Sequence, residues 1–288
     1  MRMHNADESC GTAQAAKVLG DWWNVLVLRE IARGRVRFDA LASEIGLSRK
    51  VLTERLGRLV TQGVLHRSLY QRRPVRYEYL LTEAGAALLP LLVAMQEWGD
   101  RWMLGDGSVT ATASADGAEH TRVHALTGTR LPDGLDLPGA GGEELPLVSP
   151  DAAATVVFAY PGTGVAWEEQ IPGADGCTQE NRLFRDAWPD FRRAGVDVRG
   201  LSTQLVDEQA DFARAEAIPF PLLSDASHRL AAALRLPTFR GAGRLRHKRV
   251  IVVVDAGRTV RHVLFPVVDI PRAVTESLHL AARCARTA

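Results

Sequence analysis

The second half of this 288-residue chain consists of short apolar runs that alternate with segments of helical character. The apolar runs are TVVFAY, VDVRGLS, FPLLS, KRVIVVVD and VRHVLFPV, and the helical segments cover about 178–194, 207–217, 226–235 and 270–285. Short runs rich in β-branched residues are typical of strands. Strands that alternate with helices fold in layers, with the helices packed on a central sheet. The sequence therefore predicts an α/β domain in this half.

A different pattern occupies residues 12–104, which are helix-rich with one predicted strand pair. Within VRFDALASEIGLSRKVLTERLGRLVTQGVL, a short amphipathic helix is followed by a glycine turn and a second helix that begins after Ser48. Ser48 suits the N-cap position, because its hydroxyl can accept a hydrogen bond from the first turn. The apolar stripe of the second helix faces inward, so Arg49, Lys50 and Thr53 project outward. This is the geometry of a helix-turn-helix, whose second helix contacts DNA bases.

The segment VLHRSLYQRRPVRYEYLLT, which follows, predicts a β-hairpin with a basic tip. Its alternating apolar residues are typical of a half-buried strand. Arg72, Arg73 and Arg76 lie at or next to the tip, where they can contact phosphates. Between residues 17 and 80, Lys and Arg outnumber Asp and Glu about two to one, as suits a domain bound to a polyanion. The alternative is a helical protein-interaction domain with a solvated basic face.

The segment between the two patterns is rich in Gly, Ala, Asp, Thr and Pro and sustains no apolar period. Such composition is typical of a linker. We therefore expect an α+β domain over residues 1–104, a linker over 105–124 and an α/β domain over 125–288.

Cys177 precedes the predicted helix CTQENRLFRDAWPDFRRAG, which follows the strand TVVFAY and a Gly-rich loop. At a helix N-terminus, unpaired N–H groups and the helix dipole stabilise a thiolate. A cysteine in that position is a candidate nucleophile. The alternative is a buried, inert cysteine that serves only for packing.

Other sequence features argue against several classes of protein. The N-terminus MRMHNADESC is polar, and the longest apolar stretches, such as AALLPLLVAM, are too short to span a bilayer. We therefore expect a cytoplasmic protein that is not bound to a membrane. The eight histidines show no metal-ligand spacing, and no CxxC, GxSxG or phosphate-loop motif occurs. We expect neither a metal nor an organic cofactor.

The N-terminal pattern resembles the HxlR-type winged helix family, which is itself similar to MarR proteins. Cys10, GDWW, LREI, RFDAL, SRKVLTERLGRLVTQGVL and YLLTEAG follow one another as in that family. The resemblance implies a homodimer that binds a pseudo-palindromic operator in double-stranded DNA. Several family members carry a redox-active N-terminal cysteine, so Cys10 is a candidate sensor, although Gly11 stands where the family usually has proline.

The C-terminal pattern resembles the peroxiredoxin (AhpC/TSA) family, which has a thioredoxin-like fold. CTQENRLFRD, VDVRGLS, FPLLSD and an arginine before VIVVVD occur in the family's order, over about residues 125–288. The resemblance implies that Cys177 is the peroxidatic cysteine. It implies that Arg249 holds the thiolate and the peroxide, and that Glu180 is the acidic residue of the CxxE turn. A guanidinium beside sulfur favours the thiolate and can donate to a peroxide oxygen.

Three positions depart from the peroxiredoxin pattern. Ala174 replaces a Thr or Ser, Gln170 replaces a Pro, and Arg182 occupies the place of a resolving cysteine. A resolving thiol must then be Cys284, Cys10 or an external reductant, or the sulfenic acid persists.

These features lead to three hypotheses. The first is a redox-responsive DNA-binding transcription regulator whose fused peroxiredoxin-like domain reacts with peroxide through Cys177. In it, a disulfide between Cys10 and Cys177 is one candidate switch. The second is a one-cysteine thiol peroxidase whose winged helix serves dimerisation or localisation. The third is a regulator whose redoxin-like domain binds a small ligand without redox chemistry.

Overall fold

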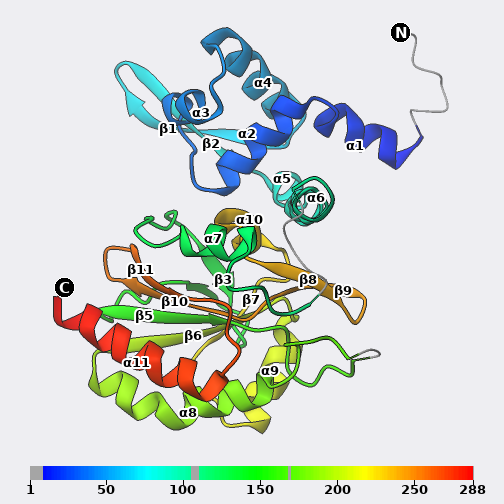
Figure 1. Cartoon of the computed structure of the whole chain (residues 1–288). Helices are drawn as coiled ribbons and strands as arrows, with labels where there is room; N and C mark the ends of the chain where they lie inside the picture. The colour runs from blue at the N-terminus through cyan, green and yellow to red at the C-terminus, as the bar shows by residue number, and fades with distance from the viewer. Residues whose placement is uncertain (1–8, 105–109, 168–169, 288) are drawn as a thin grey trace. The chain divides into compact units, whose positions relative to one another are not determined.

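The computed structural model of the chain describes residues 9–104, 110–167 and 170–287 (Figure 1). The chain divides into two compact units, Met1–Leu92 and Val93–Ala288. The boundary between the units falls inside one helix, α6 (Leu89–Trp102).

Unit 1 combines short helices with one β-hairpin. Its elements are α1 (Gly11–Leu19), α2 (Trp22–Ala32), α3 (Phe38–Ile45), α4 (Arg49–Thr61), β1 (Leu65–Arg72), β2 (Val75–Leu81) and α5 (Glu83–Ala86). α3 ends at Gly46, whose φ of +71° lets the chain turn sharply toward α4. Ser48 caps α4, because its Oγ accepts a hydrogen bond of 3.4 Å from the backbone N–H of Val51. The predicted helix-turn-helix is confirmed.

The apolar face of α4 packs into the core of unit 1. Leu52, Leu56 and Leu59 are buried, as the helical spacing predicts. β1 and β2 pair antiparallel, with Arg72 opposite Val75 next to the turn of the hairpin. Val75 is 61% exposed, although it belongs to the alternation that predicts a half-buried strand. It lies at the hairpin tip, beyond the core that covers the rest of the strand.

Unit 2 is built on a five-stranded mixed sheet in the order β11-β10-β5-β6-β7. The strands are β5 (Ala154–Ala159), β6 (Val196–Ser202), β7 (Leu222–Ser224), β10 (Val250–Asp255) and β11 (Val260–Leu264). β5, β6 and β7 run parallel, whereas β10 pairs antiparallel with both β5 and β11. Every predicted strand is present.

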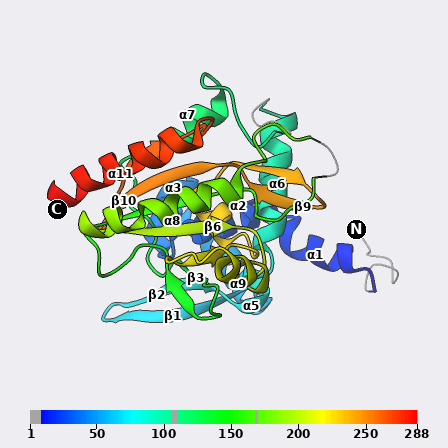
Figure 2. The ribbon, with the colours of Figure 1, turned by 90° about the horizontal axis from the view of Figure 1, so that it is seen from below.

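Helices cover both faces of this sheet (Figure 1). α8 (Cys177–Arg193) and α11 (Ile270–Thr287) pack on one face, where Phe184 and Ala281 join Val156 in an apolar cluster. α7 (Ala118–His124) and α10 (Arg229–Leu234) pack on the other face. α9 (Val206–Ala215) contacts β7 near the sheet edge. From below, α8 and α11 are seen to cross the same face (Figure 2). The layered arrangement explains why β5 is buried along its whole length.

Three features of unit 2, which comprise four strands and one helix, were not predicted. Two are short hairpins, β3 (Asp136–Pro138) with β4 (Glu144–Pro146), and β8 (Thr238–Gly241) with β9 (Arg244–His247). Strands of three or four residues are too short to produce a periodic signal. The third feature is α7, which lies inside the segment expected to be a linker. Residues 105–109 of that segment lie outside the described residues.

Among the helices that the structure describes, none is both long and apolar enough to cross a lipid bilayer.

Candidate functional site

Cys177 is the first residue of α8, as predicted, and its side chain is buried. The preceding residue, Gly176, has a φ of +92°. A Cβ atom at Gly176 would lie 2.8 Å from Ile270 of α11, so both the backbone conformation and the packing favour glycine. The sulfur is therefore held at the N-terminal end of a 17-residue helix, where the helix dipole favours negative charge.

Arg249 lies immediately before β10 and reaches the sulfur directly. Its Nη2 atom is 3.3 Å from Cys177 Sγ, and its Nε atom donates a 2.7 Å hydrogen bond to Glu180 Oε2. Nη1 donates to the carbonyl of Gly173 at 2.8 Å, and Nη2 also donates to the carbonyl of Asp175 at 3.0 Å. The guanidinium is thereby fixed on the loop that carries the cysteine. The structure brings together the three residues that the sequence predicts to be catalytic.

Burial governs the charge state of this cluster. It raises the pKa of the Cys177 thiol to about 11, and the nearby Glu180 carboxylate acts in the same direction. Arg249 opposes both effects by attracting the thiolate. Burial likewise raises the pKa of Glu180, again against the pull of Arg249. The sequence suggested that the helix start and Arg249 would favour the thiolate. Arg249 does act in that direction, but in this closed arrangement desolvation is the larger effect.

This burial predicts a loss of stability at high pH. The folded-state pKa of about 11 lies above the ordinary 9.0, so the unfolded chain releases the Cys177 proton first as the pH rises. The stability that comes from keeping the Cys177 thiol protonated is complete below about pH 9 and is lost between pH 9 and pH 11, to a total of about 3 kcal/mol. Denaturant unfolding at pH 8 and pH 10.5 should show the parent losing about 2 kcal/mol more than Cys177→Ala. Equal losses in the two proteins would contradict this assignment.

The loop after β5, which the sequence predicts, also contacts the thiol, a role that the sequence did not reveal. The backbone N–H of Gly162 faces the Cys177 sulfur and lowers its pKa. Arg246 of β9 holds this loop by donating to the carbonyl of Pro161 at 3.0 Å. The Gln204 side chain also holds this loop. Its Oε1 accepts from the backbone N–H of Thr163 at 2.8 Å, and its Nε2 donates to the carbonyl of Thr163 at 3.0 Å. The sequence feature that could have indicated the role of Arg246 is the cationic run RLRHKR before an apolar strand. Cations next to a buried strand need hydrogen-bond partners, and the loop after β5 supplies one.

Of the three positions that depart from the peroxiredoxin pattern, only Ala174 contacts Cys177. Ala174 is buried, and its carbonyl accepts from Cys177 Sγ at 3.5 Å, so it contributes a backbone oxygen and no hydroxyl. Arg182 lies on the outer face of α8 and pairs with Glu216 at 2.7 Å. Gln170 is exposed.

Cys284 lies apart from the Cys177 cluster, and Cys10 belongs to the other unit. Cys284 is buried near the C-terminal end of α11, fourteen residues after Ile270, which contacts Gly176. At 1.5 Å per residue this separation is about 21 Å along the helix, whereas a disulfide needs Cα atoms within about 7 Å. Cys10 belongs to unit 1 and is exposed. The structure therefore does not bring Cys284 to Cys177.

The predicted DNA-contacting residues of α4 lie at its exposed start. Arg49, Lys50 and Thr53 are all exposed. The Thr53 hydroxyl donates to the carbonyl of Arg49 at 2.7 Å, and the Ser48 hydroxyl caps the helix. Arg49 and Lys50 consequently carry the positive charge at this end of α4, and Ser48 and Thr53 order its first turn.

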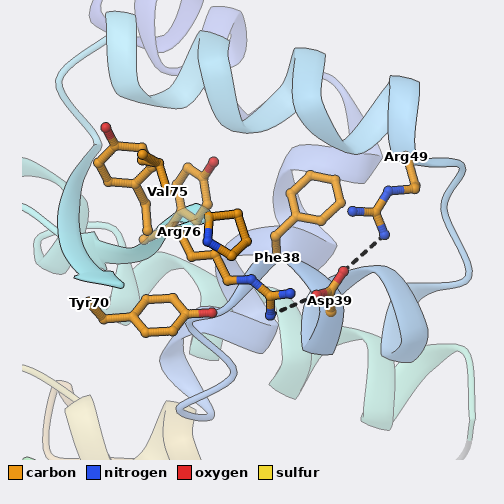
Figure 3. A pocket seen from close by; sticks show the side chains of 9 residues that line it. Phe38, Asp39, Arg49, Tyr70, Val75 and Arg76 are labelled. Carbon is orange, nitrogen blue, oxygen red and sulfur yellow. Dashed lines mark hydrogen bonds and ion pairs between the residues drawn. The ribbon is translucent and has the colours of Figure 1, made fainter. Parts of the chain in front are cut away.

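The β1–β2 hairpin (residues 65–81) is the wing, and its arginines Arg72, Arg73 and Arg76 are also exposed. Asp39 of α3, which the sequence did not single out, lies between Arg49 and Arg76 (Figure 3). Its carboxylate is 2.9 Å from Arg49 Nη1 and 3.8 Å from Arg76 Nη1. These groups border a hollow of about 280 Å³ between α3, α4 and the wing, which is lined by Phe38, Asp39, Arg49, Tyr70, Pro74, Val75, Arg76, Tyr77 and Tyr79.

Comparison with known families agrees with this division of the chain. Residues 18–106 match the HxlR-like helix-turn-helix family, and residues 128–263 match the AhpC/TSA family. An HTH-type transcriptional regulator of Mycobacterium tuberculosis is 41% identical over 96 residues, which are 33% of this chain and 60% of that protein. YvaP of Bacillus subtilis, another HTH-type transcriptional regulator, is 35% identical over 101 residues, which are 34% of this chain and 94% of YvaP.

The chain belongs to the HxlR-like helix-turn-helix family through its N-terminal part, and its C-terminal part is an AhpC/TSA domain. It spans about 60% of the length of the first mycobacterial relatives that it matches. Among solved structures, peroxidoxin BcpB from Mycobacterium tuberculosis is 28% identical with a TM-score of 0.47, over 55% of this chain and 96% of that one. Peroxiredoxin Q from Xanthomonas campestris is 23% identical with a TM-score of 0.43, over 52% and 91%.

Proposed function

We propose that this protein is a redox-responsive DNA-binding transcription regulator whose AhpC/TSA domain reacts with hydroperoxides through Cys177. The observation that carries the proposal is the contact between Arg249 and the Cys177 sulfur at 3.3 Å, at the start of a helix and with Glu180 fixing the guanidinium. A thiolate between a helix N-terminus and a guanidinium is the arrangement of a reactive cysteine.

The chemistry follows from the groups in the cluster. The thiolate attacks one peroxide oxygen, so that Cys177–S⁻ + ROOH + H⁺ gives Cys177–SOH + ROH. One S–O bond forms and the O–O bond breaks, and the sulfur loses two electrons as the peroxide is reduced to an alcohol. Arg249 is placed to donate to the departing oxygen as negative charge develops there.

An external thiol is the proposed reductant. Cys284 lies too far along α11 to reach Cys177 in this arrangement. Two external thiols, RSH, would restore Cys177: the first forms a mixed disulfide and releases water, and the second releases RSSR.

The N-terminal part is proposed to bind double-stranded DNA as a homodimer. α4 would enter the major groove with Arg49 and Lys50, and the wing would place Arg72, Arg73 and Arg76 on phosphates. Asp39 holds Arg49 and Arg76 when DNA is absent, and phosphate oxygens would replace its carboxylate on binding.

The proposal predicts that peroxide changes operator affinity only while Cys177 is present. Gel shifts of the reduced and peroxide-treated chain should differ, and a dimedone-type probe should label Cys177 after treatment. Cys177→Ser should bind DNA like the reduced parent and show neither change, whereas Cys284→Ser serves as a matched control and should respond like the parent. A peroxide response that persists in Cys177→Ser would refute the proposal.

A second candidate is a one-cysteine thiol peroxidase, in which the winged helix serves dimerisation or localisation. Its support is that Cys177, Glu180 and Arg249 all belong to unit 2, so the thiol cluster is assembled without unit 1. Peroxide consumption coupled to NADPH through a thiol reductant, together with DNA binding that ignores peroxide, would favour this candidate.

A further inference from the structure

Residues 110–124 lie between the two family matches, which end at 106 and begin at 128, yet they pack directly on the Cys177 loop. The backbone N–H of Ala111 donates to the carbonyl of Pro172 at 2.9 Å. The Ala111 side chain is buried in one apolar cluster with Ala174 and Phe239. A segment that neither family match includes therefore packs on the loop that carries Cys177.

Gly173 lies between this segment and Arg249. Its carbonyl accepts from Arg249 Nη1 at 2.8 Å. A Cβ atom on Gly173 would lie 3.1 Å from the Cβ of Thr112 and 3.3 Å from the carbonyl carbon of Ala111. The guanidinium that contacts the sulfur and the segment 110–124 thus contact the same loop residue.

Lys248 anchors the segment, and it is the residue immediately before Arg249. Its side chain is fully buried, and its Nζ donates to Glu119 Oε2 at 2.7 Å and to the carbonyl of Thr112 at 3.2 Å. Buried ammonium groups are retained only where charge and hydrogen bonds compensate them. Two consecutive residues therefore hold the two segments: Arg249 holds the Cys177 loop, and Lys248 holds residues 110–124.

The charged contacts continue from Glu119 to α6. Glu119 lies 3.9 Å from Arg122 of α7, and Arg122 lies 3.9 Å from Asp100 of α6. Asp100 also pairs with Arg235 at the end of α10. Residues 97–102 of α6 fall within the HxlR match, so the contacts run from Cys177 to a helix that continues into unit 1.

We propose that residues 110–124 position the Cys177 loop and transmit oxidation of Cys177 to α6 through Lys248, Glu119, Arg122 and Asp100. This inference rests on the proposed function, because it requires the reaction of Cys177 with a hydroperoxide. The sulfenic oxygen needs space around a buried sulfur that is already in contact with Ala174 and Arg249. Adding atoms to a packed site displaces its walls, and these walls are the loop on which Ala111 and Thr112 lie.

Hydrogen exchange of the full chain tests the inference. After hydrogen peroxide treatment, peptides that cover 110–124 should exchange at least about tenfold faster than in the reduced chain. Displacement of the Cys177 loop removes contacts of the segment, and a modest shift in its local opening equilibrium is enough for a tenfold change. The same peptides in Cys177→Ser should be unaffected by peroxide. Oxidation of Cys177 that leaves exchange over 110–124 unchanged overturns the inference.

A matched pair of variants tests transmission to DNA binding. Ala111→Glu places a charge in the buried contact with Ala174, whereas Ala115→Glu places the same charge at an exposed position of the same segment. Ala111→Glu should still be labelled at Cys177 after peroxide, but the ratio of its operator affinities with and without peroxide should fall to about 1. Ala115→Glu should keep the parent's ratio. A parent-like ratio in Ala111→Glu overturns the inference.

Asp100→Asn supplies a variant remote from the thiol, in case Ala111→Glu fails to fold. It removes the carboxylate that meets Arg122 and Arg235, and it leaves the residues around Cys177 intact. Normal labelling with an abolished DNA response supports the inference, and an unchanged DNA response overturns it. If peroxide does not label Cys177 in the parent, the proposed function fails and this inference fails with it. Only the inference fails if peroxide labels Cys177 and changes DNA binding in the parent while hydrogen exchange over 110–124 stays the same.

Discussion

Replacing Arg249 with glutamine should lower the rate constant for the reaction of Cys177 with hydrogen peroxide by at least about 100-fold, because in the proposed reaction the guanidinium that contacts the sulfur donates to the oxygen on which charge develops. The side chain also lowers the pKa of Cys177, so its loss reduces the thiolate fraction near neutral pH. The rate constant can be measured at pH 7.5 by competition with a peroxidase of known rate. DNA binding by the reduced chain provides a readout that the substitution should leave unchanged.

The Arg249 test needs two controls. Arg240→Gln is a matched control, because Arg240 is an exposed arginine of β8 and should keep the parent's rate. Arg249→Gln alone leaves the buried Glu180 carboxylate without its cation, which costs about 3–5 kcal/mol of stability. The double variant Glu180→Gln, Arg249→Gln should recover much of that stability and remain slow. A double variant that is stable and reacts as fast as the parent would remove Arg249 from the mechanism.

Sequence patterns predicted the elements that position the thiol. The helical character of residues 178–194 indicated α8, and the Gly-rich loop before Cys177 indicated where it begins. These are local properties, since periodicity and capping depend on neighbouring residues. The pairing of Arg249 with Cys177, 72 residues away, has no local signature, and only the resemblance to peroxiredoxins suggested it.

Properties that depend on packing could not be predicted from the sequence. Burial raises the pKa of Cys177, although both nearby features visible in the sequence favour the thiolate. The contact between Lys248 and Glu119 joins residues 129 positions apart, one of them in a segment whose composition indicated a linker. Asp39 was overlooked because a single acidic residue on a short helix has no distinguishing pattern, and only the fold places it between two arginines.

The proposed thiol reaction and the proposed regulation place different requirements on residues 110–124, which belong to unit 2. The thiol needs a closed site, because Arg249 and Gly162 stabilise a thiolate only at hydrogen-bonding distance. A regulator needs that site to have a second state that the DNA-binding part can distinguish. Residues 110–124 suit both requirements, since they complete the closed site and also contact α6 through Arg122 and Asp100.

The second large effect is expected on DNA affinity, from substitutions in the wing. Replacing Arg72 and Arg73 with alanine should weaken binding to operator and non-operator DNA by the same factor, because arginines at a hairpin tip bind phosphates and not bases. Each arginine–phosphate pair that is removed lowers the slope of log affinity against log salt by about 0.9. At 0.15 M salt, removing two such pairs corresponds to about a 30-fold weaker complex for each wing that engages DNA. Titrations at several salt concentrations, on both kinds of DNA, measure the factor and the slope.

Arg192→Ala with Arg193→Ala is the matched control for the wing variant, because it removes the same charge from the exposed end of α8. It should leave both affinity and salt slope unchanged, which separates a wing contact from a general effect of net charge. Lys50→Ala should behave differently again, since Lys50 lies on the proposed recognition helix. Its removal should reduce operator affinity more than non-operator affinity. A wing variant that loses operator binding alone would show that the tip reads bases, contrary to the docking proposed for it.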